Sequence, residues 1–273
     1  MSRFAETTLA WLRAFGIDPP KTVAAFRALP AVVRDYRRFR RALGQEQSTS
    51  WPVHFALPCL QERQAVSGTA RGHYFHQDLW VARRIYARNP ERHIDVGSSI
   101  FSLVARLAVF RQVEVLDIRP QPARIPNVTF RQHDLMGPIG EYEACCDSLS
   151  CLHVLEHAGL GRYGDPIDPH GYRLAFQALA RMVKPNGILY LSTPVGNPQR
   201  VEFNGHRVFA LQTILDIAKD AFELSAFAWV DDAGDLHDQD PVGSISIPDN
   251  VEYGCGIFEF GRRPGKRNCT QLA

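Results

Sequence analysis

The chain has 273 residues, of which 45% are hydrophobic and 22% are charged, and its formal net charge is +2. This composition is that of a soluble globular protein, and the near-neutral charge gives no overall indication of nucleic-acid binding, so we expect no nucleic-acid partner. No apolar run is long enough to span a bilayer, and the first residues lack a signal-peptide pattern, so we expect a cytoplasmic location. The 6 cysteines form no C-x-x-C pair, which favours buried thiols over disulfides or a zinc site.

The first 48 residues are predicted to be helical. A break is expected at Asp18-Pro19-Pro20, and a second helix from Thr22 to Leu43 is expected to be interrupted at Pro30. The latter half of this helix carries a group of basic residues: Arg34, Arg37, Arg38, Arg40 and Arg41. The simpler interpretation is a solvated helix face. The alternative is a surface for acidic partners, for the anionic lipids of a membrane to which the protein is peripheral, or for a second copy in a homo-oligomer.

The segment from His93 to Ile100 organises the rest of the chain. Its first residues favour a short buried strand, Gly97-Ser98-Ser99 favours a tight turn, and apolar residues at helical spacing follow from Phe101. A strand, a glycine turn and a helix N-terminus together favour a nucleotide-like or anionic ligand. A helix precedes the strand, and its polar start, which includes Tyr74, either lies over this turn or simply caps the helix.

Two acidic residues follow the next predicted strands. Asp117 ends the strand that begins at Val113 and lies about twenty residues beyond the glycine turn, the spacing at which a carboxylate binds ribose hydroxyls. Asp134-Leu135 follows the strand Val128–Phe130 and is placed to contact an adenine, through an exocyclic amine and apolar packing. The alternatives are a strand cap for Asp117 and an ordinary turn aspartate for Asp134.

The remaining pattern alternates strands with helices and predicts an α/β fold. We expect a Rossmann-like, doubly wound and mostly parallel sheet of seven strands with right-handed crossovers. The N-terminal helical extension is assigned to residues 1–70, the main domain to 71–265 and a C-terminal tail to 266–273. The later elements are predicted as strands at 146–152, 187–192, 222–230 and 254–260, with helices at 172–183 and 211–218.

These motifs resemble those of class I S-adenosylmethionine-dependent methyltransferases. Asp95-Val96-Gly97-Ser98-Ser99 resembles the first motif of that family, and the segments ending Val154-Leu155-Glu156-His157 and Lys184-Pro185-Asn186-Gly187 look like its fourth-strand motif and the following turn. The resemblance implies that S-adenosylmethionine is bound by a set of residues at the first three strand ends: Asp95, Gly97, Ser98, Ser99, Asp117, Ile118, Asp134, Leu135 and Tyr74. The run from His153 to Gly171 also resembles an uncharacterised bacterial family linked to surface-polysaccharide assembly.

Three histidines lie where strand ends and their loops are expected. His153 follows the fourth strand beside the expected methyl position, His157 comes shortly after it, and His206 is in the loop after the fifth strand. A hydroxyl acceptor is a poor nucleophile, so a base with a pKa near neutrality assists methyl transfer to it. We therefore predict catalytic roles for these histidines. The alternatives are that His153 only lines the pocket and that His157 caps or packs.

The loop after the fourth strand carries further polar residues. Asp165, Asp168 and His170 together suggest a divalent metal site, since oxygen-rich clusters suit magnesium or calcium. The alternative is that the Asp-Pro pairs are ordinary turn formers.

The leading hypothesis is an S-adenosylmethionine-dependent O-methyltransferase that acts on a small molecule, a sugar or a glycan intermediate. Ser99 and a further non-glycine residue stand where the family has glycines, and serine lets a ligand approach the backbone less freely. The second hypothesis is therefore a catalytically inactive scaffold of a glycan-assembly complex. An NAD-dependent oxidoreductase would share the turn and Asp117, but the Leu-Glu-His and Lys-Pro-Asn-Gly segments disfavour it.

Overall fold

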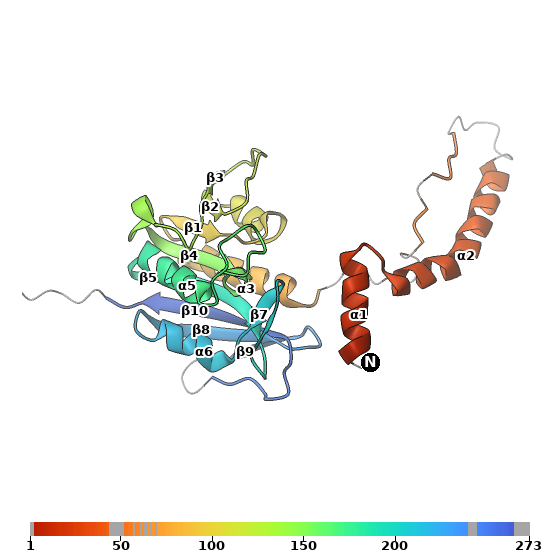
Figure 1. Ribbon diagram of the computed structural model, residues 1–273. Coiled ribbons are helices and arrows are strands. Elements are labelled where there is room, and N and C mark those ends of the chain that lie inside the picture. The colour runs from red at the N-terminus through yellow and green to blue at the C-terminus, as the bar shows by residue number, and fades with distance from the viewer. Residues whose placement is uncertain are drawn as a thin grey trace, which may run out of the picture. The chain divides into compact units, whose positions relative to one another are not determined.

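The computed structural model describes residues 3–43, 52–56, 58–60, 62, 65, 67–68, 70–239 and 245–264. The chain divides into two compact units, Met1–Thr69 and Ala70–Ala273 (Figure 1). The expected tail at 266–273 lies outside the described residues. Each unit is considered by itself.

The first unit contains two helices, α1 (Arg3–Ala14) and α2 (Pro19–Leu43). Pro30 lies inside α2 without interrupting it, so the expected break there is wrong. Proline cannot donate a hydrogen bond to the carbonyl of Phe26, but α2 has no buried residue, so water can satisfy that carbonyl. Within the described part of the chain, no helix combines the length and the apolar character that crossing a bilayer requires.

The second unit is built on one sheet of eight strands in the order β3-β2-β1-β4-β5-β10-β8-β9. The five strands from β3 to β5 are parallel, and the last three pair antiparallel. The bounds of the strands are β1 (His93–Val96), β2 (Val113–Asp117), β3 (Val128–Gln132), β4 (Cys146–Leu152), β5 (Val183–Val195), β8 (Phe222–Val230), β9 (Leu236–Gln239) and β10 (Gly254–Arg262). The fold is thus the expected Rossmann-like α/β fold.

The sheet has eight strands rather than the seven predicted, because β9 returns along β8 from a tight turn. Gly234 donates to the carbonyl of Asp231 at this turn, and Asp231 donates to Asp235. The sequence of β9 is Leu-His-Asp-Gln, which has no β-branched residue and no apolar alternation, so its pattern does not indicate a strand. A separate two-stranded ribbon, β6 (Arg200–Glu202) and β7 (His206–Val208), forms in the segment that was predicted as a loop.

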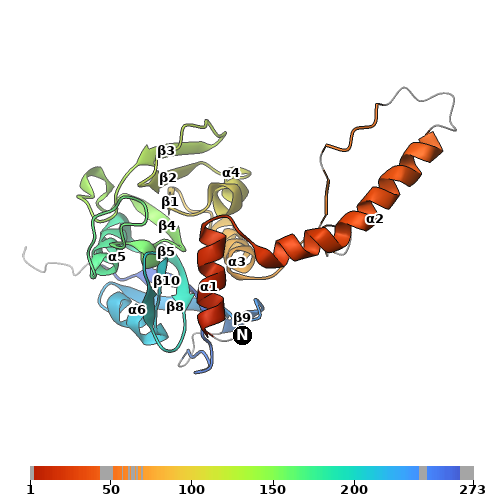
Figure 2. The ribbon, with the colours of Figure 1, turned by 45° about the vertical axis from the view of Figure 1, so that its right-hand side comes forward.

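Helices cover both faces of the sheet, as the alternation of apolar side chains requires. Figure 2 shows α3 (His73–Arg88) and α4 (Ala105–Ala108) on one side of the strands, and α5 (Gly171–Met182) and α6 (Leu211–Ala218) on the other. Within β8, Phe227 packs into the core on the α5 side, while its neighbour Ala228 packs into the core on the α3 side. The domain is therefore doubly wound around two cores.

The segment after β1 differs in detail from the expected helix. A π-helical turn spans Ile100–Val104, and only four residues of α-helix follow it in α4. The wide turn carries Ser102, whose hydroxyl donates to the buried carboxylate of Asp78 in α3. The turn after β1 is consequently tied to α3 through side chains.

The chain reverses its direction across the sheet at β1. This strand pairs with β2 on one side and with β4 on the other, so the first three strands extend one way and the later strands the other. Ligands of open α/β sheets bind outside the carboxyl ends of the strands at such a reversal. The fold thus directs attention to the loops after β1, β2, β3 and β4.

A buried histidine at the start of β1 makes the stability of the domain depend on pH. Ser150 Oγ donates to Asp95 Oδ1 at 2.5 Å, so its oxygen accepts from His93 Nε2 at 3.1 Å, while His93 Nδ1 contacts Ser148 Oγ at 2.8 Å. Burial, with a smaller contribution from Arg111, lowers the pKa of His93 from 6.5 to about 3. The neutral imidazole is therefore the form that the fold holds.

We expect the free energy of unfolding to fall as the pH is lowered from 6.5 towards 3. The unfolded chain binds a proton at this histidine in that range and the folded chain does not, which costs about 3 kcal/mol by pH 4. Urea unfolding of His93→Gln at pH 7, 5 and 4 should show a shallower decline than wild type. His170→Gln, at an exposed histidine, is the matched control and should follow wild type. Equal declines in all three proteins would contradict the assignment.

Candidate functional site

Two adjoining pockets open at the carboxyl ends of the strands. The first, which we call the narrow pocket, has a volume of about 590 Å³ and lies at the ends of β1, β2 and β3. The second, which we call the wide pocket, has a volume of about 1290 Å³ and extends towards α3 and β7. Five residues line both pockets: Gly97, Arg119, His153, His157 and Tyr163.

The turn after β1 forms part of the wall between the pockets. Gly97 has a φ of 67°, and a Cβ there would lie 2.9 Å from the Val154 side chain, so only glycine fits without strain. Ser98 Oγ accepts a hydrogen bond from the backbone N–H of Leu152 at 3.2 Å, which fastens the turn to β4. Ser99 Oγ is buried and has no hydrogen-bond partner among the described residues, so this hydroxyl is available to a ligand.

Asp95 lies beneath the turn and lines neither pocket. Its carboxylate accepts hydrogen bonds from the Ser98 N–H at 3.1 Å and from Ser150 Oγ. Burial raises the pKa of Asp95 to about 6, although both hydrogen bonds oppose the shift. Asp95 therefore supports the glycine turn from inside the protein. It was expected to contact the cofactor, but it does not line either pocket.

Asp117 lines the narrow pocket and is paired with Arg119, which belongs to no motif of the sequence. Arg119 donates to its carboxylate from the backbone N–H at 2.8 Å, from Nε at 3.0 Å and from Nη2 at 2.6 Å. The guanidinium also lies 4.6 Å from the ring centre of Tyr163. Arg119 is half exposed, so it can turn away when another donor approaches Asp117.

The far side of the narrow pocket is supplied by the segments after β2 and β3. Ile118, Asp134 and the buried Leu135 line it together with His133. Asp134 Oδ1 accepts from the backbone N–H of Met136 at 2.9 Å, which leaves its second oxygen uncommitted to that turn. His133 Nε2 is buried without a hydrogen-bond partner among the described residues. The pocket thus combines apolar walls with the carboxylates of Asp117, Asp134 and Asp165.

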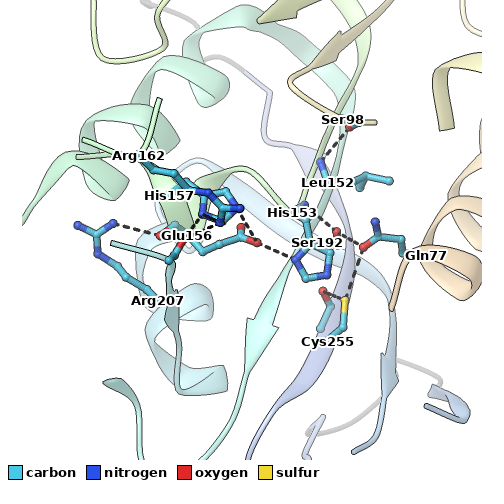
Figure 3. Close-up of polar contacts among 12 residues, drawn as sticks. Gln77, Ser98, Leu152, His153, Glu156, His157, Arg162, Ser192, Arg207 and Cys255 are labelled. Carbon is cyan, nitrogen blue, oxygen red and sulfur yellow. Dashed lines mark hydrogen bonds and ion pairs between the residues drawn. The ribbon is translucent and has the colours of Figure 1, made fainter. Parts of the chain in front are cut away.

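A buried polar network surrounds His153, which follows β4 with a φ of 55° (Figure 3). Its Nδ1 lies 2.6 Å from Glu156 Oε1, and its backbone N–H donates to Ser192 Oγ at 3.2 Å. Ser192 in turn donates to Gln77 Oε1 at 2.6 Å. Burial would lower the pKa of His153, but the neighbouring Cys255 and Glu156 outweigh burial and raise it. Glu156 therefore fixes the orientation of the ring.

The loop that carries His157 is held by two arginines. His157 Nδ1 donates to the carbonyl of Gly205 at 2.7 Å, and Arg162 donates to the same oxygen at 2.8 Å. The buried guanidinium of Arg207 donates to four backbone carbonyls of this loop: Glu156, Ala158, Asp168 and Pro169. These bonds fix the loop at the junction of the two pockets.

His206 and Tyr74 face the wide pocket from opposite elements. His206 lies at the start of β7, with its ring centre 5.2 Å from that of Tyr253. Tyr74, near the start of α3, is 55% exposed and lies 5.0 Å from the ring of His153. Burial lowers the pKa of His206, so its imidazole is neutral at neutral pH.

The structure does not bring the suggested metal ligands together. The Asp165 carboxylate accepts hydrogen bonds from the backbone N–H groups of Gly159, Gly161 and Tyr163, and Asp168 accepts from the N–H of His170. Their oxygens thus close turns of the loop, which is the alternative that the Asp-Pro pairs indicated. Asp168 and His170 also lie outside both pocket walls.

Several residues of the site carried no recognisable pattern in the sequence. Arg119, Tyr163 and Tyr253 line the pockets from loops, where spacing does not indicate which way a side chain points. Cys255 and His73 lie beside His153 but belong to elements far from it in the sequence. For Arg119 alone the sequence offered an indication, because it lies two residues after Asp117 and is close enough in the chain to pair with that carboxylate.

A family model described as "Caenorhabditis protein of unknown function, DUF268" matches residues 114–236, which is less than half of the chain. No curated protein sequence matches significantly. The matched segment runs from β2 to the start of β9 and includes Asp117, Asp134 and His153. The family description assigns no activity.

Solved structures with a similar fold include several methyltransferases. The N-methyltransferase NodS from Bradyrhizobium japonicum WM9, in complex with S-adenosyl-L-homocysteine, is 14% identical with a TM-score of 0.47, covering 71% of this chain and 89% of that chain. A 1,6-didemethyltoxoflavin-N1-methyltransferase from Burkholderia thailandensis is 15% identical with a TM-score of 0.47, covering 70% and 84%. The cyclase SpnF is 14% identical with a TM-score of 0.48, covering 73% and 86%. Likeness at this level carries no activity over to this chain.

Proposed function

We propose that the protein is an S-adenosylmethionine-dependent methyltransferase, with the cofactor in the narrow pocket and the acceptor in the wide pocket. The observation that carries this proposal is the convergence of Gly97, Asp117 and Asp134 in one pocket from three successive strand ends. Asp117 is suited to accept from the ribose hydroxyls, and Asp134 with Leu135 suits the adenine amine and ring. Ser99 offers its free hydroxyl in the adjoining wide pocket, so the amino-acid end of the cofactor would extend past the Gly97 turn into that pocket.

The acceptor that we propose is a hydroxyl of a sugar or glycan intermediate. The wide pocket is large and is lined by polar and aromatic side chains, among them Tyr74, Arg162, His206 and Tyr253. The sulfonium cofactor supplies an electrophilic methyl group, so the protein has to align the acceptor oxygen with it and exclude water. His206 is the base that we favour because its imidazole is neutral and faces this pocket.

His157 serves this site by position rather than by proton transfer. Its Nδ1 donates to the Gly205 carbonyl, one residue before His206, and thereby couples the loop after β4 to the start of β7. His153 lies at the junction of both pockets, where it would contact the reacting groups. We keep a direct role for His153 and assign a positioning role to His157.

A scaffold without catalytic activity is the second candidate. The occupied carboxylate of Asp117 favours it, since Arg119 already donates three hydrogen bonds to that group. Cofactor binding separates the two proposals, because a scaffold needs no affinity for S-adenosylmethionine.

The test is a calorimetric titration of the full chain with S-adenosylhomocysteine, with NAD as the control ligand. The proposal predicts one site of micromolar affinity for S-adenosylhomocysteine and no heat of binding with NAD. Absence of binding to both ligands would support the scaffold, and binding of NAD alone would indicate an oxidoreductase.

A second experiment examines His206 once a methyl acceptor has been found among sugars. His206→Gln is expected to lower turnover by about 10²–10⁴-fold, the usual contribution of a general base, without changing the affinity for S-adenosylhomocysteine. His170→Gln, at an exposed histidine outside both pockets, should leave turnover unchanged. An unchanged rate in His206→Gln would remove this residue from the chemistry.

A further inference from the structure

Two histidines and a cysteine come together beside the wide pocket. One ligand atom from each of His73, His153 and Cys255 lies within 4.8 Å of the other two. His73 begins α3, His153 follows β4, and Cys255 is the second residue of β10, so three elements distant in the sequence supply the group. Among the described residues, no other set of three acidic, histidine or cysteine side chains meets this spacing.

We propose that His73, His153 and Cys255 form a binding site for a divalent transition metal of the Zn²⁺ type. Two imidazole nitrogens and one thiolate form a donor set that suits zinc, whereas magnesium and calcium prefer oxygen. Zinc bonds of about 2.0–2.3 Å place tetrahedral ligand atoms roughly 3.3–3.8 Å apart. The ligand atoms therefore have to move closer together than the observed 4.8 Å, and the parallel rings of His73 and His153, whose centres are 5.2 Å apart, have to tilt so that one nitrogen of each faces the same ion.

The orientation of His153 supplies independent support. Its Nδ1 is occupied by Glu156 at 2.6 Å, and Figure 3 shows the ring between Glu156 on one side and Cys255 on the other. The second nitrogen, Nε2, is buried and has no hydrogen-bond partner in the described chain. The side chain is only 8% exposed. A buried polar atom without a partner is unusual in a folded protein and calls for a ligand.

The contact with Glu156 is itself typical of metal sites. A histidine that binds a metal through one nitrogen usually donates its other N–H to a carboxylate, which fixes the ring and makes the coordinating nitrogen more basic. Glu156 is almost fully buried and meets His153 in this way. When the ion binds, His153 Nε2 gives up the proton that its raised pKa retains, and Cys255 binds as a thiolate. The buffer takes up the released protons, so the step needs no oxidant or reductant.

The site has a position left for a further ligand. Three protein ligands leave one corner of a zinc tetrahedron open. His153 lines the wide pocket, and so does Tyr253, two residues before Cys255. If the proposed function holds, an acceptor oxygen can occupy that corner and lose its proton more readily on the metal. The binding of the ion itself does not depend on that function.

The sequence disfavoured a zinc site because no two cysteines have a suitable spacing. The group in the structure needs no pair of cysteines, because it combines a single cysteine with histidines from two other elements. Cys145 and Cys146 are adjacent in sequence, yet neither belongs to the group. They provide matched controls for variants of Cys255.

The test uses the full chain after treatment with a chelator, titrated with Co²⁺ alone and then with Zn²⁺ alone. We expect one equivalent of Co²⁺ to give the absorption of a tetrahedral ion together with a thiolate charge-transfer band, and Zn²⁺ to displace it. Cys255→Ser should abolish the charge-transfer band, whereas Cys145→Ser and Cys146→Ser should keep it. Glu156→Gln should weaken Co²⁺ affinity by about 10–100-fold, because it loosens the orientation of His153.

His73→Gln provides a second variant at a partly exposed position, for the case in which Cys255→Ser does not fold. It should weaken Co²⁺ binding by more than Glu156→Gln does. Absence of stoichiometric binding would overturn the proposal, as would a charge-transfer band that survives Cys255→Ser. The absorption spectrum is read without S-adenosylhomocysteine, so failure of the metal site and failure of the methyltransferase proposal are distinguishable.

Discussion

Asp117→Ala is expected to weaken S-adenosylhomocysteine binding by at least about 100-fold while leaving the Tm close to that of wild type. In the proposed complex this carboxylate accepts from two ribose hydroxyls, and hydrogen bonds to a charged group contribute roughly 1.5–3 kcal/mol each. A loss of about 3 kcal/mol corresponds to about 100-fold in Kd. The carboxylate is largely shielded but lies at the pocket wall and not in the core, so its removal creates no cavity among packed side chains.

The pairing of Asp117 with Arg119 sharpens this experiment. Ribose hydroxyls and the guanidinium compete for the same two oxygens, so Arg119→Ala should leave the affinity unchanged or raise it by up to about fivefold, the strength of an exposed ion pair. Asp216→Ala, on the surface of α6, controls for the loss of one negative charge. Calorimetric titration gives Kd for each protein. Full affinity in Asp117→Ala would show that the ligand binds elsewhere.

Gly97→Ala is expected to lose about 2–5 kcal/mol of stability and to abolish binding in the narrow pocket. A side chain at a φ of 67° costs about 1–2 kcal/mol, and the new Cβ would lie 2.9 Å from Val154 Cγ2, which adds a packing cost of about 1–3 kcal/mol. Because Gly97 lines both pockets, the shifted backbone changes the wall that any ligand meets.

Two further variants separate these costs. Gly164→Ala has a φ of 84° with no atom within 4 Å of its Cβ, so it carries the conformational cost alone. The double variant Gly97→Ala/Val154→Ala removes the steric contact and keeps the conformational cost. Urea unfolding should rank Gly97→Ala as less stable than Gly164→Ala. A Gly97→Ala protein as stable as wild type would contradict the described turn.

The central strand β5 could be predicted because its segment Leu189–Leu191 is fully buried and forms a continuous apolar run. In β4, Leu149, Cys151 and Leu152 are buried as well, although Ser148 and Ser150 stand among them. β9 and the β6–β7 ribbon escaped prediction because both have polar sequences whose pairing depends on turns and on the neighbouring strand. The predicted helix break at Pro30 was wrong for a related reason. The cost of a proline inside a helix depends on whether water can reach the carbonyl that loses its hydrogen bond, and the sequence does not show which residues are exposed.

In the candidate site, too, some features could be predicted from the sequence and others could not. Gly97, Asp117 and Asp134 could be expected to meet because parallel strands bring their carboxyl ends to one edge. The direction of each side chain could not be foreseen, so Asp95 turned out to support the glycine turn from below, and Asp165 to close its own loop. Arg119 and Cys255 were missed because neither lies at a spacing typical of a motif.

The two pockets share a wall, and this shared wall affects the order in which two ligands bind. Gly97, His153 and His157 face both cavities, so a molecule that fills the narrow pocket completes one side of the wide pocket. The two ligands are then coupled thermodynamically, and each should bind more tightly in the presence of the other. If the acceptor binds first, the wide pocket still lacks the wall that the bound methyl donor would supply. Under the proposed function, this favours an order of binding in which the methyl donor binds first and is released last.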